Sequence, residues 1–316
     1  MKLKINTFQA LAGVALVVTS VLIISSSTNL NIYGQEFNVN IINAEPTIES
    51  VKVNLDGSIN SANVSLIRLS AGENSDYYVI AEIQDLNSIF DIVDVRIDMY
   101  RSGVNNAQQC KRDVQNCFHL SLRNEDCTLE PMSVIDGVVV CKVELPYWTD
   151  ATFGHKSIYE SEVWKVRVVA EDTDSALAED ANYENEVGSL LAVRAVDEFT
   201  IGNVLPGSSS KNGVLLEFEN VGNVEADFRI RSSDLECAIG IIPAENQRLD
   251  VANGSYEDML QSETSILLDG SDGSDTGLVL SPRSTKNDSV GTVYHTLEVP
   301  LGVKGPCSGE NVITGI

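Results

Sequence analysis

The chain has 316 residues, with 46 acidic and 21 basic side chains and a formal net charge of −25 at pH 7. Such an excess of carboxylates repels phosphate backbones, so the composition argues against a nucleic-acid partner. The length is enough for two domains of ordinary size.

The first residues have the layout of an export signal. Lys2 and Lys4 precede an apolar run over residues 10–24, and small polar residues follow it. A run of about 15 apolar residues is shorter than the roughly 20 that span a bilayer. Residues 1–34 are therefore expected to be a cleaved signal peptide, with an uncleaved membrane anchor as the alternative. The protein is expected to be extracellular or at the cell surface, and to meet a membrane only through an uncleaved N-terminus.

Beyond Glu45 the sequence is a series of short β-branched runs separated by turn residues, which is typical of a β-sandwich. Strands are expected at Thr47–Asn54, Asn63–Leu69, Tyr77–Gln84, Ile92–Tyr100, Gly137–Leu145, Val163–Ala170 and Ser189–Val196. Seven strands over this length predict an Ig-like β-sandwich at residues 46–199. Short helices are expected at Ser175–Asn185 and Tyr256–Gln261.

A second β-sandwich is predicted over residues 200–316, so the fold class is all-β, with two Ig-like β-sandwich domains in tandem. Its strands are expected in FTIGNVLPG, GVLLEFEN and ADFRIRSS, and at Glu236–Ile242, Ser265–Leu268, Thr292–Val299 and Asn311–Ile316. The stretch NVGNV is expected to close a tight hairpin at Gly222.

Six cysteines in an exported chain predict disulfide bonds. Proximity favours Cys110–Cys117, Cys127–Cys141 and Cys237–Cys307, although the four cysteines of the first domain allow three pairings. The stretch from Cys110 to Cys127 is a polar insertion in that domain. A zinc site is the alternative, but the spacings lack the CxxC pairs that structural zinc prefers, and only His119 is near.

Sequence motifs of enzymes are missing. His119, His155 and His295 lie in separate segments, and no GxSxG, HExxH, P-loop or GxGxxG motif frames them. Pairs of carboxylates have no diagnostic value in a chain with 46 of them. The protein is therefore not expected to be an enzyme, and no catalytic residue is assigned.

Oxygen-bearing side chains gather in two loops of the first domain. The loop after Tyr77–Gln84 carries Asp85, Asn87 and Asp91, and the loop after Val163–Ala170 carries Asp172 and Asp174. An Ig-like sandwich places these loops at the same end, where their oxygens suit calcium. Calcium is the only cofactor that the sequence suggests. The alternative is that Asp and Asn favour turns.

Three sequons, headed by Asn63, Asn253 and Asn287, are candidate glycosylation sites. Chance matches are the alternative in a sequence rich in Ser and Asn.

The segment at residues 35–45 is expected to be extended. Within it, Gln35–Ile42 (QEFNVNII) places Phe37, Val39 and Ile41 on one side of a strand. It is either an additional local strand or a donor strand that completes the sandwich of a neighbouring subunit.

The stretches EPTIESVKVN, IQDLNSIFDIVDVRIDMYRSG, VWKVRVVAEDTDS and TLEVPLGVKGPCSG together resemble exported, disulfide-stapled Ig-like surface proteins of archaea and little-studied bacteria. This resemblance implies a fold and says little about activity. GNVLPG followed by FENVGN is similar to the sandwich domains of secreted fibre proteins of the TasA/camelysin type, which implies polymer formation. The disulfides of this chain depart from that pattern.

Together these features predict a secreted or cell-surface structural protein, a filament subunit that assembles by strand donation. The alternative is a calcium-stabilised adhesion module. The expected partners are accordingly other copies of the chain, or surface proteins and glycans.

Overall fold

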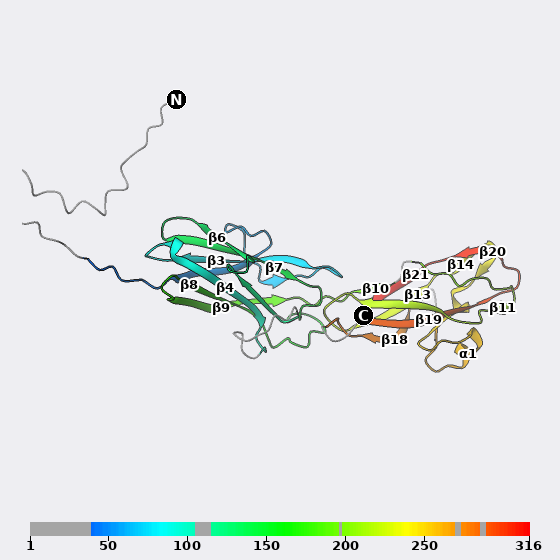
Figure 1. The fold of residues 1–316 in the computed structure, drawn as a ribbon. Helices are drawn as coiled ribbons and strands as arrows, with labels where there is room; N and C mark the ends of the chain where they lie inside the picture. Colours follow the sequence, from blue (N-terminus) through cyan, green and yellow to red (C-terminus); the bar gives the residue numbers. More distant parts are fainter. Residues whose placement is uncertain (1–38, 105–114, 196–197, 269–272, 285–288) are drawn as a thin grey trace, which may run out of the picture. The chain divides into compact units, whose positions relative to one another are not determined.

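The computed structural model describes residues 39–104, 115–195, 198–268, 273–284 and 289–316 (Figure 1). The chain divides into two units, residues 1–42 and residues 43–316. The second unit is all-β, as predicted, and the α-helix within the described residues is the short α1 (Tyr256–Gln261). No described helix has the length and apolar character needed to cross a membrane.

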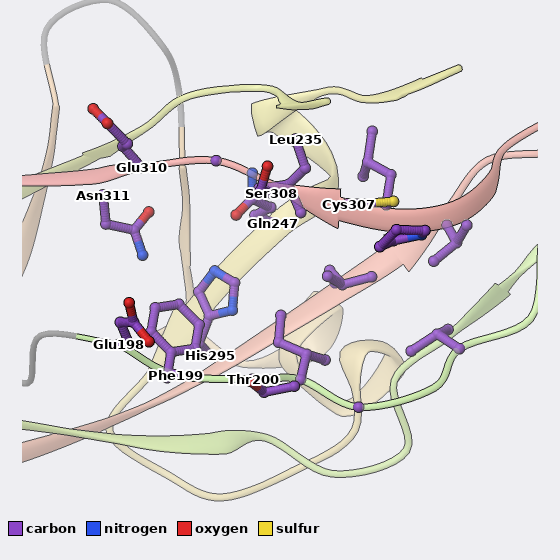
Figure 2. Close-up of a pocket in the computed structure, with 18 of the residues that line it drawn as sticks. Glu198, Phe199, Thr200, Leu235, Gln247, His295, Cys307, Ser308, Glu310 and Asn311 are labelled. Atoms are coloured by element: carbon purple, nitrogen blue, oxygen red, sulfur yellow. The ribbon is translucent and has the colours of Figure 1, made fainter. Parts of the chain in front are cut away.

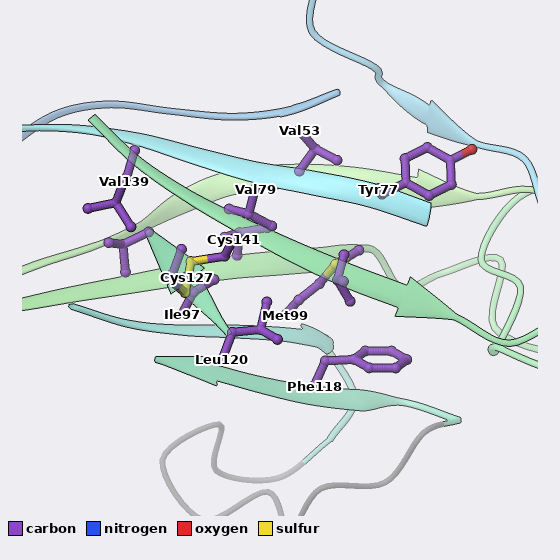
Figure 3. Close-up of a cluster of buried hydrophobic side chains, with 14 of the residues drawn as sticks. Val53, Tyr77, Val79, Ile97, Met99, Phe118, Leu120, Cys127, Val139 and Cys141 are labelled. Carbon is purple, nitrogen blue, oxygen red and sulfur yellow. A yellow bond between two sulfur atoms is a disulfide. The ribbon is translucent and has the colours of Figure 1, made fainter. Parts of the chain in front are cut away.

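The first sandwich consists of two facing sheets. One contains β1 (Thr47–Asn54), β3 (Ser75–Gln84), β7 (Asp136–Leu145) and β6 (Cys127–Pro131), in that spatial order. The other contains β2 (Leu66–Ile67), β9 (Leu177–Val187), β8 (Trp164–Asp172), β4 (Ile92–Arg101) and β5 (Cys117–Ser121). Side chains from both inner faces form one core, for example Val79, Ile97 and Val139 (Figure 3). Burying these β-branched faces is what stabilises the sandwich.

The helix predicted at Ser175–Asn185 is wrong, because residues 177–185 of this stretch belong to strand β9. Its Ala- and Glu-rich sequence has helical propensity, but β9 pairs with β8 and buries Val187 completely. Tertiary packing therefore outweighs local propensity here. The polar insertion also contains more structure than expected, because its described part forms β5 and reaches the start of β6.

The second sandwich also has two layers. One sheet has the order β10 (Val193–Ala195), β12 (Val214–Asn220), β19 (Val290–Val299), β16 (Gln247–Asp250) and β17 (Ile266–Leu267), with β11 (Ser208–Ser209) on β19. Opposite it are β18 (Ser274–Leu280), β13 (Ala226–Ser232) and β21 (Asn311–Gly315), and the group β15 (Ile241–Ile242), β14 (Leu235–Ile239) and β20 (Lys304–Ser308). Phe218 and Phe228 pack between the layers with ring centroids 4.7 Å apart.

The hairpin predicted at Gly222 is wrong, because β12 and β13 belong to different sheets. The buried side chain of Asn220 accepts a hydrogen bond from the Gly222 N–H and donates to the carbonyls of Val224 and Leu280. These bonds guide the chain from one sheet to the other. The strand predicted in FTIGNVLPG is also wrong, because Phe199–Gly207 has no strand pairing to any described residue.

Two disulfides join directly paired residues of neighbouring strands. Cys127 on β6 is bonded to Cys141 on β7, and Cys237 on β14 is bonded to Cys307 on β20. Both match the pairing expected from proximity. Cys117 is disulfide-bonded as well, whereas Cys110 lies outside the described residues, so that pair stays a prediction. Stable disulfides indicate that the protein folds in an oxidising environment.

Candidate functional site

A cavity of about 1080 Å³ lies in the second sandwich (Figure 2). Its apolar lining comes from both layers and includes Leu216, Phe218, Ile230, Ile242, Leu297 and Val299. Ala195 of β10 and Ile313 of β21 also line it, and among the described strands each of these two strands ends its sheet. The cavity therefore lies between the two layers and reaches their edges at β10 and β21, and we call it the edge groove.

The segment Glu198–Val204 lies along the edge groove. Its side chains alternate, since Phe199 and Ile201 are partly buried while Glu198 and Thr200 are exposed. Phe199 packs on the main core of this sandwich, and Ile201 packs on the smaller core cluster around Leu297. Between described residues, however, the main chain of Glu198–Val204 makes no hydrogen bond. The segment fills the groove with side chains without extending either sheet.

His295 on β19 is the most unusual polar group of the edge groove. Its side chain is 1% exposed, and neither ring nitrogen has a hydrogen-bond partner among the described residues. Its ring lies 5.2 Å from the Phe199 ring in an edge-on arrangement, and both are visible in Figure 2. Burial lowers the pKa of His295 from 6.5 to about 4, because the charged imidazolium would lose its hydration. The side chain is neutral at pH 7 and offers one donor and one acceptor.

Acidification is expected to destabilise the protein through His295. Between pH 6.5 and pH 4 the unfolded state binds a proton at this residue and the folded state does not, so the free energy of unfolding falls as the pH falls. The loss should amount to about 3 kcal/mol by pH 4. Denaturant unfolding gives the free energy of unfolding of the wild type and of His295→Leu at each pH from 7 to 4. The expected loss is the amount by which the wild type falls more steeply than His295→Leu over this range. The exposed His155→Gln serves as the control, and parallel curves for wild type and His295→Leu would contradict the expectation.

The predicted assembly residues are described only in part. Val39 is 78% exposed and Ile41 is 83% exposed. Phe37 lies outside the described residues. Ile42 is 80% exposed as well, so three large apolar side chains of the described part of the segment are available to a partner.

The predicted calcium residues mainly hold their own loops. Asp85 Oδ1 accepts hydrogen bonds from the N–H groups of Asn87 and Ser88, and Asp172 Oδ1 accepts from those of Asp174 and Ala176. Such bonds are the turn role that was the alternative interpretation. Asp91 ends a 3₁₀ turn and Asp174 is exposed.

The two loops are nevertheless brought together. The Asn43 amide donates to Asp172 Oδ2 at 2.6 Å, and the Ala44 N–H donates to Asn87 Oδ1 at 2.6 Å, so consecutive residues bridge both loops. Asp85 Oδ2 is buried without a hydrogen-bond partner among the described residues. The described part of the chain contains no group of three or more His, Cys, Asp or Glu residues placed to hold a metal ion. The calcium site stays a prediction.

The sequons differ in their surroundings. Asn63 is exposed, and its side-chain oxygen accepts a hydrogen bond from the Val53 N–H at 3.1 Å. Asn253 is exposed in the loop before α1, while Asn287 lies outside the described residues. Glycosylation of these residues stays a prediction.

No protein-family model and no curated protein matches the chain. Solved structures with similarity include dimeric latent PorU from Porphyromonas gingivalis, at 8% identity and a TM-score of 0.24, over 83% of this chain and 24% of that one. α2-Macroglobulin of E. coli aligns at 10% identity and a TM-score of 0.23, over 85% and 17% of the two chains. A chaperone–tip adhesin complex of CFA/I fimbriae aligns at 10% identity and a TM-score of 0.27, over 84% and 83%. The chain thus spans less than a quarter of the first two proteins. At such TM-scores the similarity supports no statement about function, which has to be inferred from the chain's own geometry.

Proposed function

We propose that the protein is a secreted or cell-surface structural subunit that polymerises by strand donation, with Gln35–Ile42 as the donor. The observation that carries this proposal is the exposure of Val39 and Ile41, which alternate with Asn38 and Asn40 in the sequence. Exposed side chains of this size, two residues apart, provide the apolar half of a β-strand.

The composition and covalent structure support the same proposal. A donated strand gains affinity from main-chain hydrogen bonds and specificity from alternate side chains that enter pockets. The disulfides suit an oxidising exterior, and cross-links strengthen a subunit that has to stay folded there. The N-terminal sequence pattern predicts the export that this proposal requires.

The test is assembly of the purified, oxidised protein from residue 35 onward. Size-exclusion chromatography and negative-stain electron microscopy should show filaments. A monomer at all protein concentrations, and in the presence of preformed seeds from the native source, would argue against the proposal.

The second candidate function is a calcium-stabilised adhesion module that binds a glycan or another protein. It is favoured by the buried Oδ2 of Asp85, which has no hydrogen-bond partner among the described residues. The loop of Asp85 is joined to the Asp172 loop through the consecutive residues Asn43 and Ala44. A buried carboxylate oxygen without a partner is costly, and a cation would offset that cost.

If calcium binds there, the wild type should melt at a higher temperature in millimolar calcium than in EDTA. Asp85→Asn combined with Asp172→Asn should remove that difference, because each amide keeps an acceptor oxygen for the loop and loses the charge. Differential scanning calorimetry with and without calcium measures the effect, and magnesium serves as the control cation. Identical wild-type melting curves in calcium and EDTA would exclude the site.

A further inference from the structure

The donor segment has a counterpart inside the same chain. Residues 36–39 read Glu-Phe-Asn-Val and residues 198–201 read Glu-Phe-Thr-Ile, so both have an acidic residue, a phenylalanine, a polar residue and a β-branched residue. The second copy of this pattern is the part of Glu198–Val204 that lies in the edge groove. The structure therefore shows what such a sequence does when it meets this groove: Phe199 and Ile201 turn inward, and Glu198 and Thr200 face water.

The contact that this internal segment makes is incomplete. Its side chains pack, but its main chain makes no hydrogen bond to another described residue. β21, whose Ile313 also lines the edge groove, pairs with β13 along one side, and no described strand pairs with its other side. A strand placed against β21 would gain the ladder hydrogen bonds that Glu198–Val204 forgoes.

The groove also keeps unfilled space and an unsatisfied polar group. A volume of about 1080 Å³ remains with the internal segment in position. His295 faces this space from β19, and its two ring nitrogens lack partners among the described residues (Figure 2). The peptide groups of an inserted strand provide both a donor and an acceptor, which is what a neutral imidazole requires.

We propose that the edge groove is the acceptor site for residues 36–41 of a second copy of this chain, and that Glu198–Val204 is an internal cap which the donor displaces. Phe37 then takes the place of Phe199, and Val39 takes that of Ile201. This inference rests on the proposed function, since it names the surface that receives the donor strand. In a subunit without a neighbour, Glu198–Val204 covers the apolar groove and so prevents the subunit from aggregating through it.

A labelled peptide of residues 35–42 tests the site directly. Fluorescence anisotropy measures its binding to the protein from residue 43 onward, which forms a compact unit without the segment. The peptide is expected to bind, and a control peptide with Ser at positions 37, 39 and 41 is expected to bind at least ten times more weakly. Equal binding of the two peptides would overturn the proposal.

Two variants of the acceptor separate the groove from other surfaces. Ile313→Arg places a charge at the groove edge of β21 and should weaken binding at least tenfold. Val279→Arg alters an exposed residue of β18, on the other edge of the same sheet, and should leave binding unchanged. Thermal melting confirms that each variant is folded. If Ile313→Arg does not fold, Leu235→Arg, on the part of the groove formed by β14, takes its place. Equal peptide affinity for the two arginine variants would exclude the groove.

The cap has its own test. Phe199→Ala with Ile201→Ala weakens the internal competitor, so this variant should bind the peptide at least tenfold more tightly than the wild type. An unchanged affinity would exclude displacement.

Assembly of the protein from residue 35 onward distinguishes the two proposals. Filaments together with a peptide that does not bind would overturn the groove and leave strand donation standing. A protein that stays monomeric, together with a peptide that does not bind the groove, would overturn both proposals.

Discussion

Deleting residues 35–42 is expected to abolish filaments and to leave the rest of the protein folded. The unit that begins at Asn43 contains both sandwiches and all of the buried core residues that the structure describes. Val39 and Ile41 are exposed, so their removal takes no apolar surface out of either core. Negative-stain electron microscopy should show no filaments, while far-UV circular dichroism and the melting temperature should match those of the parent protein.

Substitutions within the segment distinguish the effect of its apolar side chains from the effect of shortening the chain. Substituting Ser for Phe37, Val39 and Ile41 should prevent assembly, because the apolar face of the strand is lost. Substituting Ser for Asn38 and Asn40, on the opposite face, should preserve it. Filaments of normal yield from the first variant would show that the segment is not the donor.

Removing the Cys237–Cys307 disulfide is expected to cost more stability than removing Cys127–Cys141. The first bond closes a loop with a sequence separation of 70 residues, and the second closes one of 14. In the chain-entropy model these loops correspond to about 4 and about 3 kcal/mol. The two cysteines of each pair are replaced by Ala, and equilibrium unfolding in guanidinium chloride measures the free energy of unfolding of each variant.

The position of each bond gives a further control. Each disulfide joins directly paired residues of neighbouring strands, so replacing it should leave the strand register intact. A reduced wild-type protein should reproduce at least the sum of the two losses. If each pair of alanine substitutions lowers the free energy of unfolding by less than about 1 kcal/mol, the predicted stabilisation by the disulfides would be contradicted.

The strands that are rich in β-branched residues could be predicted from the sequence. The structure places β1 at the predicted Thr47–Asn54 and extends the predicted Tyr77–Gln84 and Ile92–Tyr100 by two residues or fewer. α1 was predictable because Ser255 and Asp258 form a capping box at its start. Strand β9 was not, since its sequence favours a helix and only its pairing with β8 makes it a strand.

The candidate site was predictable only in its linear parts. The alternation of the donor segment and the spacing of the cysteines can be read from neighbouring residues. The edge groove cannot, because Phe199, His295 and Ile313 are far apart in the chain and meet only when the two layers stack. One signal was available, namely the Glu-Phe-polar-β-branched pattern that occurs at residues 36–39 and again at 198–201. It acquires meaning only once the second copy is seen in a cavity.

The Cys237–Cys307 bond also limits how far the chain can stretch. Tension applied to the two ends of the protein passes through the sulfur–sulfur link and bypasses the loop of 70 residues that it closes. At roughly 3.4 Å per extended residue, this withholds about 240 Å of contour length. A pulled subunit can lose its sheet pairing within that loop, yet the loop cannot be drawn out. Under force the oxidised protein is therefore less extensible than the reduced one.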